Sequence, residues 1–305
     1  MHISHNFYRY YSIASSMEYT NLISENKDDV VLDLLLTVEE YETKGIPGIR
    51  KKGFCSTFLA EAEIESEVRL FIKPSEFHLP ETTKEETVHR KSLVLEPLSK
   101  ITATKGQEPV LLIGAGSGIA PFRGFYQQMM LNSINPKYHS EVVQKMERLN
   151  YNEDSEVDDL KDLMENYVHQ SEGEEGRSKR SITLFYGCRG RKSNLLSKET
   201  KLYSTILTRF DAFSRERNKE YNHEVMEKES ELVYNALVKQ NGFIYVCGKI
   251  MMADTVFKSF ISIITQQLIQ DNDDKEKLAF VDQISEDFMN SLRDNGRYNE
   301  DIFGN

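Results

Sequence analysis

The strongest constraint on the fold is a short apolar segment that runs directly into a series of alternate glycines. Residues 109–128 read PVLLIGAGSGIAPFRGFYQQ. The apolar run Val110–Ile113 predicts a buried strand, and Ala120-Pro121 predicts the start of a helix, because proline suits the first helical turn. A strand, a glycine turn and a helix N-terminus form an arrangement that binds phosphate through backbone N–H groups. The candidate phosphate contacts are Gly114, Gly116 and Gly118.

The glycine spacing distinguishes this turn from the common dinucleotide fingerprint. Ile119 stands where the pattern GxGxxG requires its third glycine, and the segment reads GxGxGxAPF instead. Glycine lets the backbone approach an anion closely. The turn therefore predicts a phosphate site that belongs to a different family from the one with the common fingerprint.

Strand and helix signals alternate through the second half of the chain. Apolar runs predict strands at 182–187 and 243–246, and periodic apolar positions predict helices at 198–210, 227–240 and 253–268. Alternating strands and helices imply a parallel sheet with right-handed crossovers, in which ligands bind beyond the carboxyl ends of the strands. The segments expected to converge there are the glycine turn, residues 187–189 and residues 246–248.

Two polar stretches interrupt this pattern. Residues 81–108 are interpreted as a linker, and residues 131–180 as an acidic insertion. One amphipathic helix is expected within the insertion, because apolar side chains recur there at helical spacing: Val157, Leu160, Leu163, Met164, Tyr167 and Val168. The remainder of the insertion is expected to be disordered, because it is too polar to bury a core.

Composition argues against several classes of partner. The 305 residues carry 38 basic and 49 acidic side chains, a net charge of −11, which disfavours nucleic acid and anionic membranes. The three cysteines are far apart and lack CxxC spacing, which indicates a reducing compartment. This pattern argues against a disulfide framework and against a metal site. No apolar run reaches the roughly 18 residues of a membrane span, and no secretory signal is visible, so a cytoplasmic location is expected.

A basic cluster stands out in this acidic chain. It comprises Ser214, Arg215, Arg217, Lys219 and Tyr221. Arginine forks beside a serine hydroxyl suit a 2′-phosphate, and the tyrosine can stack on adenine. The alternative interpretation is an ordinary solvated loop. The position of the cluster, just beyond the expected sheet, favours the phosphate site.

Two N-terminal strings contain further candidate groups. RYYS at Arg9–Ser12 offers an arginine for a pyrophosphate, a tyrosine to stack on a flavin ring and a serine hydroxyl to reach the ring. GFCST at Gly53–Thr57 begins a predicted helix whose N–H groups suit the same pyrophosphate. An ordinary strand and an ordinary helix cap are the alternatives. For Cys247, Asp301 and Phe303 the alternatives are a packed small residue, a solvated carboxylate and a docking side chain.

Seven segments, taken in order, resemble one known series. They are RYYSIASS, GFCSTFL, GAGSGIAPFRGF, FYGCRGR, FSR, YVCG and RYNEDIFG. With them the chain resembles the NADPH- and FAD-binding part of diflavin reductases, in the ferredoxin–NADP reductase superfamily. Three features, FHLP at Phe77–Pro80, APFRGFYQQ at Ala120–Gln128 and the RYNEDIFG end, resemble most the reductase region of nitric oxide synthases. The related microsomal cytochrome reductases end in tryptophan, and this chain contains none.

This resemblance implies an α/β fold in which residues 109–305 form a parallel-sheet NADPH-binding domain. Residues 1–80 would be part of an antiparallel β-barrel FAD-binding domain. In the family, further barrel strands and a connecting domain precede the position of Arg9. The sequence is therefore expected to be a fragment of a longer polypeptide and to bind FAD poorly alone, because a half-barrel exposes strand edges. FMN and haem would belong to the missing upstream domains.

The resemblance also implies a role for each motif residue. FAD contacts are implied at Arg9, Tyr11, Ser12, Gly53, Cys55, Ser56 and Thr57. NADPH contacts are implied, beside the glycine turn, at Ser117, Arg189, Ser214, Arg215, Lys219 and Tyr221. The residues around hydride transfer would be Ser12, Cys247 and Asp301, with Phe303 covering the flavin.

The implied function is that of an NADPH-dependent FAD oxidoreductase that passes electrons to an FMN domain. The cofactors would carry the chemistry, and the protein would orient them. The alternatives are a catalytically silent NADPH-binding or interaction module and a cytochrome-reductase-type diflavin reductase. An NADH-linked reductase is disfavoured by Ser214-Arg215.

Overall fold

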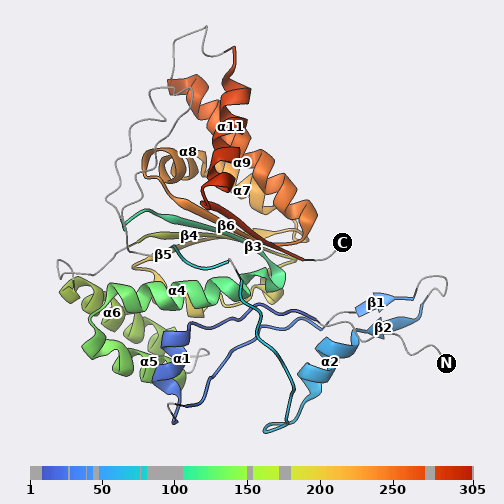
Figure 1. Ribbon diagram of the computed structural model, residues 1–305, viewed down its shortest axis with the longest axis vertical. Coiled ribbons are helices and arrows are strands. Elements are labelled where there is room, and N and C mark those ends of the chain that lie inside the picture. The colour runs from blue at the N-terminus through green and yellow to red at the C-terminus, as the bar shows by residue number, and fades with distance from the viewer. Residues whose placement is uncertain are drawn as a thin grey trace.

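A five-stranded parallel sheet lies at the centre of the computed structural model, with helices on both of its faces (Figure 1). The structure describes residues 9–26, 28–38, 40–43, 48–75, 77–80, 106–149, 154–171, 180–271 and 279–303. Several segments discussed above lie outside these ranges: residues 81–105 of the expected linker, residues 150–153 and 172–179 of the expected insertion, and residues 304–305.

The strand order of the sheet is β5-β4-β3-β6-β7, and every neighbouring pair is parallel. The strands are β3 (Val110–Ala115), β4 (Ile182–Cys188), β5 (Leu207–Phe213), β6 (Phe243–Gly248) and β7 (Tyr298–Ile302). The chain passes outward from β3 to β5 and then continues on the other side of β3 with β6. Strand order therefore reverses between β3 and β6, where such sheets form a ligand crevice. The expected parallel α/β fold is confirmed.

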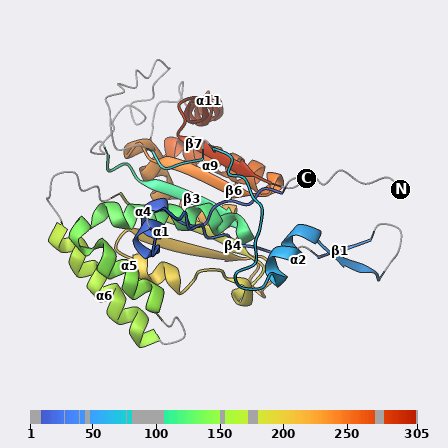
Figure 2. The ribbon, with the colours of Figure 1, turned by 60° about the horizontal axis from the view of Figure 1, so that its bottom comes forward.

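Two layers of helices cover the sheet (Figures 1 and 2). One layer contains α1 (Met17–Ile23), α4 (Ala120–Ser133), α5 (His139–Arg148) and α6 (Asp154–Ser171). The other contains α7 (Asn222–Lys228), α8 (Ser230–Tyr234), α9 (Ile250–Asp271) and α11 (Val281–Asp294). The side chains of Val110–Ile113 in β3 are fully buried. A parallel strand covered on both faces requires this continuous apolar run.

Short helical turns connect these elements. They are the 3₁₀ turns η1 (Gly116–Ile119), η2 (Pro136–Tyr138), η3 (Arg191–Ser193) and η4 (Glu199–Tyr203), and the π turn η5 (Asn235–Lys239). The helix expected at 227–240 is thereby divided into α7, α8 and η5. In the described part of the chain, no helix is both long and apolar enough to span a bilayer.

The helix expected at residues 198–210 is wrong. After η4 the chain forms β5, which pairs in parallel with β4 over seven residues. Short apolar runs fit both helical and strand periods, and the sequence pattern alone does not separate them. The strand forms because β4 offers a full row of backbone hydrogen-bonding groups to the incoming segment. β5 is consequently the edge strand that leads into the basic cluster.

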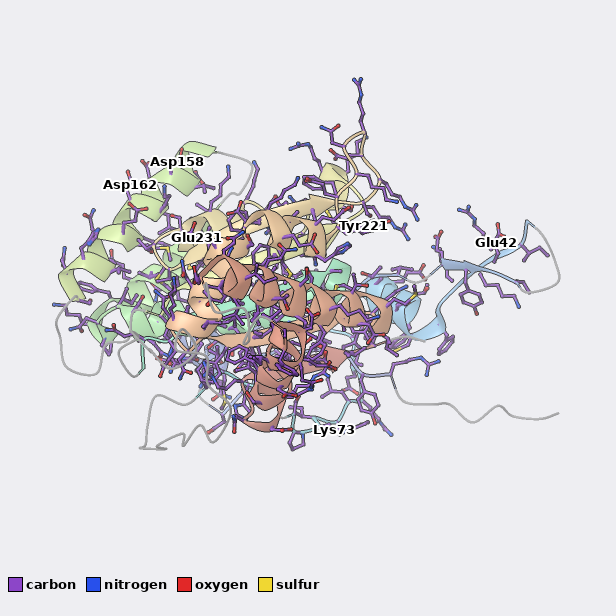
Figure 3. The ribbon with its side chains drawn as sticks, turned by 90° about the horizontal axis from the view of Figure 1, so that it is seen from above. Glu42, Lys73, Asp158, Asp162, Tyr221 and Glu231 are labelled. Carbon is purple, nitrogen blue, oxygen red and sulfur yellow. The ribbon has the colours of Figure 1, made fainter. Side chains whose placement is uncertain are left out.

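The acidic insertion is more ordered than expected. Its predicted amphipathic helix is confirmed as α6, whose buried face includes Val157, Leu160, Met164 and Val168. A second helix, α5, precedes it and was not anticipated; its buried side chains include Val142, Val143 and Met146. Tyr138 and Tyr167 stack with ring centroids 4.0 Å apart and join the two helices. In Figure 3, Asp158 and Asp162 project from the outer side of α6.

Little of the expected half-barrel is seen among the described N-terminal residues. β1 (Glu40–Glu42) and β2 (Arg50–Lys52) form one antiparallel pair, and a single bridge joins Ile13 to Leu34. Glu42 marks this hairpin, which projects away from the sheet (Figure 3). α2 (Phe54–Glu61) follows it.

Phe77, the first residue of the FHLP string, attaches the N-terminal part to the sheet. Its ring centroid lies 5.6 Å from that of Phe125 in α4 and 5.3 Å from that of Tyr245 in β6. The Tyr245 hydroxyl donates a hydrogen bond to the carbonyl oxygen of His78 at 2.7 Å. Aromatic pairs of this kind add packing energy beyond simple area burial. The N-terminal extension, meaning the described residues up to Pro80, and one face of the sheet therefore share one core.

Candidate functional site

The glycine turn follows β3 at the point where strand order reverses. Gly116 has φ +57°, a backbone region that favours glycine. A Cβ at Gly118 would lie 2.2 Å from the carbonyl oxygen of Cys247, so only glycine lets the turn pack against β6. A Cβ at Gly114 would lie 2.9 Å from a ring carbon of Phe122 in α4. Ser117 lies in η1, which leads directly into α4. The first N–H groups of a helix lack partners within it and suit an anion.

Asn222 supports this turn and was not anticipated from the sequence. Its Nδ2 donates a hydrogen bond to the carbonyl oxygen of Gly114 at 2.9 Å. Its Oδ1 is buried and has no hydrogen-bond partner within the described ranges. A Cβ at Gly187 would lie 2.6 Å from that oxygen. Asn222 therefore fixes the ends of β3 and β4 to the start of α7. The local sequence does not indicate that Asn222 contacts the glycine turn, because asparagine is common near the start of any helix.

Ser12, Cys247 and Asp301 meet at the carboxyl ends of β6 and β7. The Ser12 Oγ donates a hydrogen bond to Asp301 Oδ2 at 2.9 Å, although the two residues are 289 positions apart. Asp301 is the register partner of Cys247. The Cys247 side chain is fully buried. Burial and then the charge of Asp301 raise the pKa of its thiol well above the usual range, so the thiol is neutral at physiological pH.

Phe303 lies next to this group. Its backbone N–H donates a hydrogen bond to the carbonyl oxygen of Gly248 at 2.9 Å, which extends the β6–β7 pairing past the strand ends. Its side chain is 40 % exposed. An aromatic ring therefore stands partly open to solvent beyond Cys247.

The candidate FAD residues form a second group in the N-terminal extension. The Tyr11 hydroxyl lies within hydrogen-bonding reach of the Cys55 thiol. Burial raises the pKa of Tyr11 to about 12, helped by Cys55, whereas the charge of Arg9 opposes the shift. Gly53 precedes α2 and accepts hydrogen bonds from Ser56 Oγ at 3.3 Å and from the N–H of Thr57 at 3.0 Å. The RYYS and GFCST strings are therefore neighbours in space.

Ser214 and Arg215 continue the β4–β5 ladder beyond its last residues. The N–H of Ser214 donates to the carbonyl oxygen of Cys188 at 2.9 Å, and that of Arg215 to Arg189 at 2.9 Å. Ser214 Oγ also donates to the Cys188 carbonyl at 3.2 Å. The side chains of Arg189 and Arg215 are exposed at the same sheet edge. The guanidinium groups of Arg189 and Arg215 and the hydroxyl of Ser214 therefore lie at the edge where the sequence predicts a phosphate site.

A shallow pocket of about 530 Å³ adjoins this edge. Its lining residues are Arg189, Gly190, Arg191, Lys192, Ser193 and Glu216. Glu216 accepts a hydrogen bond from the backbone N–H of Arg191 at 2.7 Å and lies 3.4 Å from its Nε. The Arg191 guanidinium lies over the Phe213 ring, 5.1 Å from its centroid. Only Arg189 was selected from the sequence. The signal for Gly190, Arg191 and Lys192 was the run RGRK, three cations in four residues after a strand.

Lys219 and Tyr221 complete the basic cluster. The Lys219 Nζ lies 4.8 Å from the centroid of the Tyr221 ring. A hydrogen bond with Tyr221 raises the pKa of Lys219, so its charge is kept. The Tyr221 ring is 43 % exposed, and its N–H donates to Glu224 Oε2 at 2.7 Å at the start of α7. Figure 3 shows Tyr221 well separated from the acidic α6.

The comparison with known families covers the glycine turn, the basic cluster and most of the sheet. Residues 112–258 match the oxidoreductase NAD-binding domain. About half of the chain is therefore similar to an oxidoreductase NAD-binding domain. The glycine turn, Arg189, the basic cluster and Cys247 all lie within the matched residues.

Relatives extend the similarity to almost the whole chain. Nitric oxide synthases from Anopheles stephensi and Drosophila melanogaster are 28% and 27% identical to it over 303 residues. An inducible nitric oxide synthase from Gallus gallus is 26% identical over 304 residues. Each alignment covers 97% of this chain but only 18%, 16% and 20% of the respective relative. The chain thus spans about a fifth of the length of these relatives. The resemblance to a diflavin-reductase part is confirmed.

Proposed function

We propose that the chain is an NADPH-dependent flavoprotein oxidoreductase module that transfers hydride from NADPH to FAD. The observation that carries the proposal is the hydrogen bond from Ser12 to Asp301 beside the buried Cys247. This bond connects the N-terminal extension to the last strand of the sheet at its ligand-binding edge. A second cofactor held by the extension would therefore meet a dinucleotide held by the glycine turn.

The groups at the sheet edge fit NADPH. The N–H groups of the η1–α4 start and the Ser117 hydroxyl suit its pyrophosphate. Arg189, Ser214 and Arg215 suit its 2′-phosphate, because a guanidinium binds phosphate by a two-pronged, charge-assisted contact. The exposed ring of Tyr221 suits the adenine. This set of donors favours NADPH over NADH, since NADH has no 2′-phosphate.

The groups of the N-terminal extension fit FAD. The charge of Arg9 and the first N–H groups of α2 suit a pyrophosphate, and Tyr11 can stack on a flavin ring. The hydroxyl of Thr57, near the start of α2, is buried without a hydrogen-bond partner in the part of the chain that the structure describes, so a polar atom is left for a ligand. When bound, FAD supplies the acceptor for the hydride.

Ser12, Asp301 and Cys247 orient the reacting groups. Asp301 fixes the Ser12 hydroxyl in one rotamer, because the carboxylate accepts its proton in a hydrogen bond. Cys247 presents a neutral and compact thiol, so no negative charge builds up beside Asp301. Phe303 would cover the flavin face until the nicotinamide arrives. Such positioning can contribute on the order of 7 kcal/mol or more to a reaction between two bound rings.

The electrons would leave one at a time to an FMN-containing domain. The relatives are named nitric oxide synthases, and this chain corresponds to about a fifth of each. We place the acceptor on a longer polypeptide or on a separate partner.

The test is reduction of added FAD by NADPH. The 305-residue chain is purified and mixed with excess FAD; flavin binding is followed by absorbance, and turnover by ferricyanide reduction. We expect NADPH to reduce the flavin and NADH to do so much more slowly. Ser12→Ala should slow reduction by about 100-fold, because a displaced reacting pair loses its alignment. The matched control is Ser291→Ala, because the Ser291 hydroxyl donates to the carbonyl oxygen of Phe288 within α11 and lies away from the glycine turn.

Two results would count against this function. NADPH binding without any flavin binding would support the silent NADPH-binding module instead. Flavin reduction that is equally fast with NADH and NADPH would remove the proposed role of the basic cluster.

A further inference from the structure

Arg123, in the first turn of α4, connects three separate parts of the chain. Its Nε donates to both carboxylate oxygens of Glu199, at 2.9 and 3.0 Å. Its Nη1 donates to the carbonyl oxygen of Ala14 at 3.0 Å and to Asp33 Oδ2 at 2.6 Å. The Arg123 side chain is only 17 % exposed. A largely buried guanidinium therefore joins α4 to η4 and to the two N-terminal segments that contain Ala14 and Asp33.

The charge of Arg123 is maintained by its partners. Burial by itself would lower the pKa of the guanidinium, but Glu199, with Asp33, more than offsets this, so the pKa is raised. Glu199 in turn accepts a hydrogen bond from the buried Tyr126 hydroxyl at 2.8 Å. A buried ion pair of this kind is strongly destabilised when one partner is removed, because the other charge stays buried.

The N-terminal segment at Arg123 is tightly specified. The N–H of Ala14 donates to the carbonyl oxygen of Asp33 at 2.7 Å, and the N–H of Asp33 donates to Ser15 Oγ at 3.0 Å. A Cβ at Gly124 would lie 2.9 Å from the Ser15 carbonyl oxygen, so only glycine permits this approach. The N–H of Ser16 donates to a glutamine side chain of α4 at 2.9 Å. Residues 14–16 therefore lie directly on α4, as both ribbon views show for the adjoining α1 (Figures 1 and 2).

The same helix thus fixes two distant parts of the site. Its N-terminus continues from the glycine turn, and Arg123, one turn later, holds Ala14. Ser12, whose hydroxyl reaches Asp301, lies only two residues before Ala14. We propose that Arg123 is a positioning residue that sets the distance between the dinucleotide turn and the Ser12 hydroxyl. This proposal rests on the proposed function for its kinetic part, but not for its structural part.

The experiment compares Arg123→Met with Arg123→Lys and with a matched control. The control is Arg180→Met, because Arg180 is also buried and binds Glu108 and the carbonyl oxygens of Gly106 and Pro80, at the opposite end of the sheet. Native-state hydrogen exchange at the amides of residues 14–16 is measured in the 305-residue chain. Single-turnover flavin reduction by NADPH, with added FAD, and the Kd for NADPH are measured in parallel.

For Arg123→Met we expect the amides of residues 14–16 to exchange at least about tenfold faster, because their charge-assisted anchor is lost. Flavin reduction should slow by about 100-fold while the Kd for NADPH changes little, since the loss is one of alignment. Arg123→Lys should restore part of the slow amide exchange at residues 14–16 and part of the rate of flavin reduction. Arg180→Met should lower the free energy of unfolding but should change neither the exchange at residues 14–16 nor the rate of flavin reduction.

Three results would overturn the proposal. They are unchanged exchange at residues 14–16 in Arg123→Met, an unchanged reduction rate in a well-folded variant, and equal effects in Arg180→Met. A wild-type chain that reduces no flavin would refute the proposed function. The exchange comparison would still decide whether Arg123 holds the segment.

Discussion

Replacing Gly118 with alanine tests how closely the glycine turn is packed against β6. The added Cβ would lie 2.2 Å from the carbonyl oxygen of Cys247 and 2.8 Å from its carbonyl carbon. Non-bonded carbon atoms prefer separations of about 3.5–4.0 Å, so the overlap with the carbonyl carbon is about 1 Å. The obstacle is backbone and cannot rotate away. Either the turn or the end of β6 must therefore move by about that amount.

The cost follows from this overlap. Overpacking a rigid site costs about 1–3 kcal/mol in the free energy of unfolding, and we expect the upper part of that range. The effect on function should be larger, because a displacement of about 1 Å can reduce a positioned reaction by about 100-fold. Gly118→Ala should consequently weaken NADPH binding and flavin reduction beyond what the loss of stability explains.

Two neighbouring glycines supply matched controls. A Cβ at Gly248 would meet the Met252 side chain, at 2.8 Å from Cε and 3.1 Å from Sδ, and this flexible tip can rotate aside. A Cβ at Gly116 meets nothing within 4 Å, but φ +57° costs an alanine about 1–2 kcal/mol. The losses in unfolding free energy should therefore rank Gly118→Ala first, Gly116→Ala second and Gly248→Ala last.

The assay is urea unfolding of each variant, followed by NADPH titration under conditions where all are folded. Stability and NADPH affinity in Gly118→Ala that match those of Gly248→Ala would refute the reasoning. That result would mean that the turn does not pack against Cys247 as described.

Three further predictions concern the remaining groups. Arg215→Ala should weaken NADPH binding by roughly 2–3 kcal/mol with little change for NADH, as titrations with both cofactors would show; an equal loss for both removes its phosphate role. Asp301→Asn should slow flavin reduction by NADPH by about 100-fold without changing NADPH affinity, measured by stopped-flow absorbance; an unchanged rate contradicts its role in fixing Ser12. Burial raises the pKa of Tyr186 and Tyr234 to about 12. Because an unfolded tyrosine titrates near about 10, the stabilisation is complete below that pH and is lost as pH rises from about 10 to 12. Urea midpoints against pH check this, and tyrosinate absorbance of the native chain that rises fully near pH 10 would contradict it.

Local signals predicted the elements that depend on local chemistry. The apolar run of β3, the glycine turn and the proline at the start of α4 were readable because each residue type suits its own backbone conformation. The buried face of α6 was readable from its helical period. β5 was not, because a short run of Leu207–Phe213 satisfies both periods, and only pairing with β4 decided between them. α5 and α11 were also missed, although their buried side chains recur at helical spacing.

The site shows the same division. Sequence order and resemblance indicated which residues would gather, including Ser12 and Asp301. Only the tertiary structure revealed Asn222 beneath the glycine turn and Arg123 between α4 and the N-terminal extension. The three partners of Arg123 lie 76, 90 and 109 positions away in the chain, and no local pattern encodes contacts of that range. The amino-acid sequence alone therefore determined the strand, the glycine turn and the helix start, because these depend on neighbouring residues, and the order of its motifs indicated the family resemblance. The tertiary structure decided how the N-terminal segment with Ser12 is held beside the glycine turn, because a buried charge pairs with whichever opposite charge lies close to it in the folded chain.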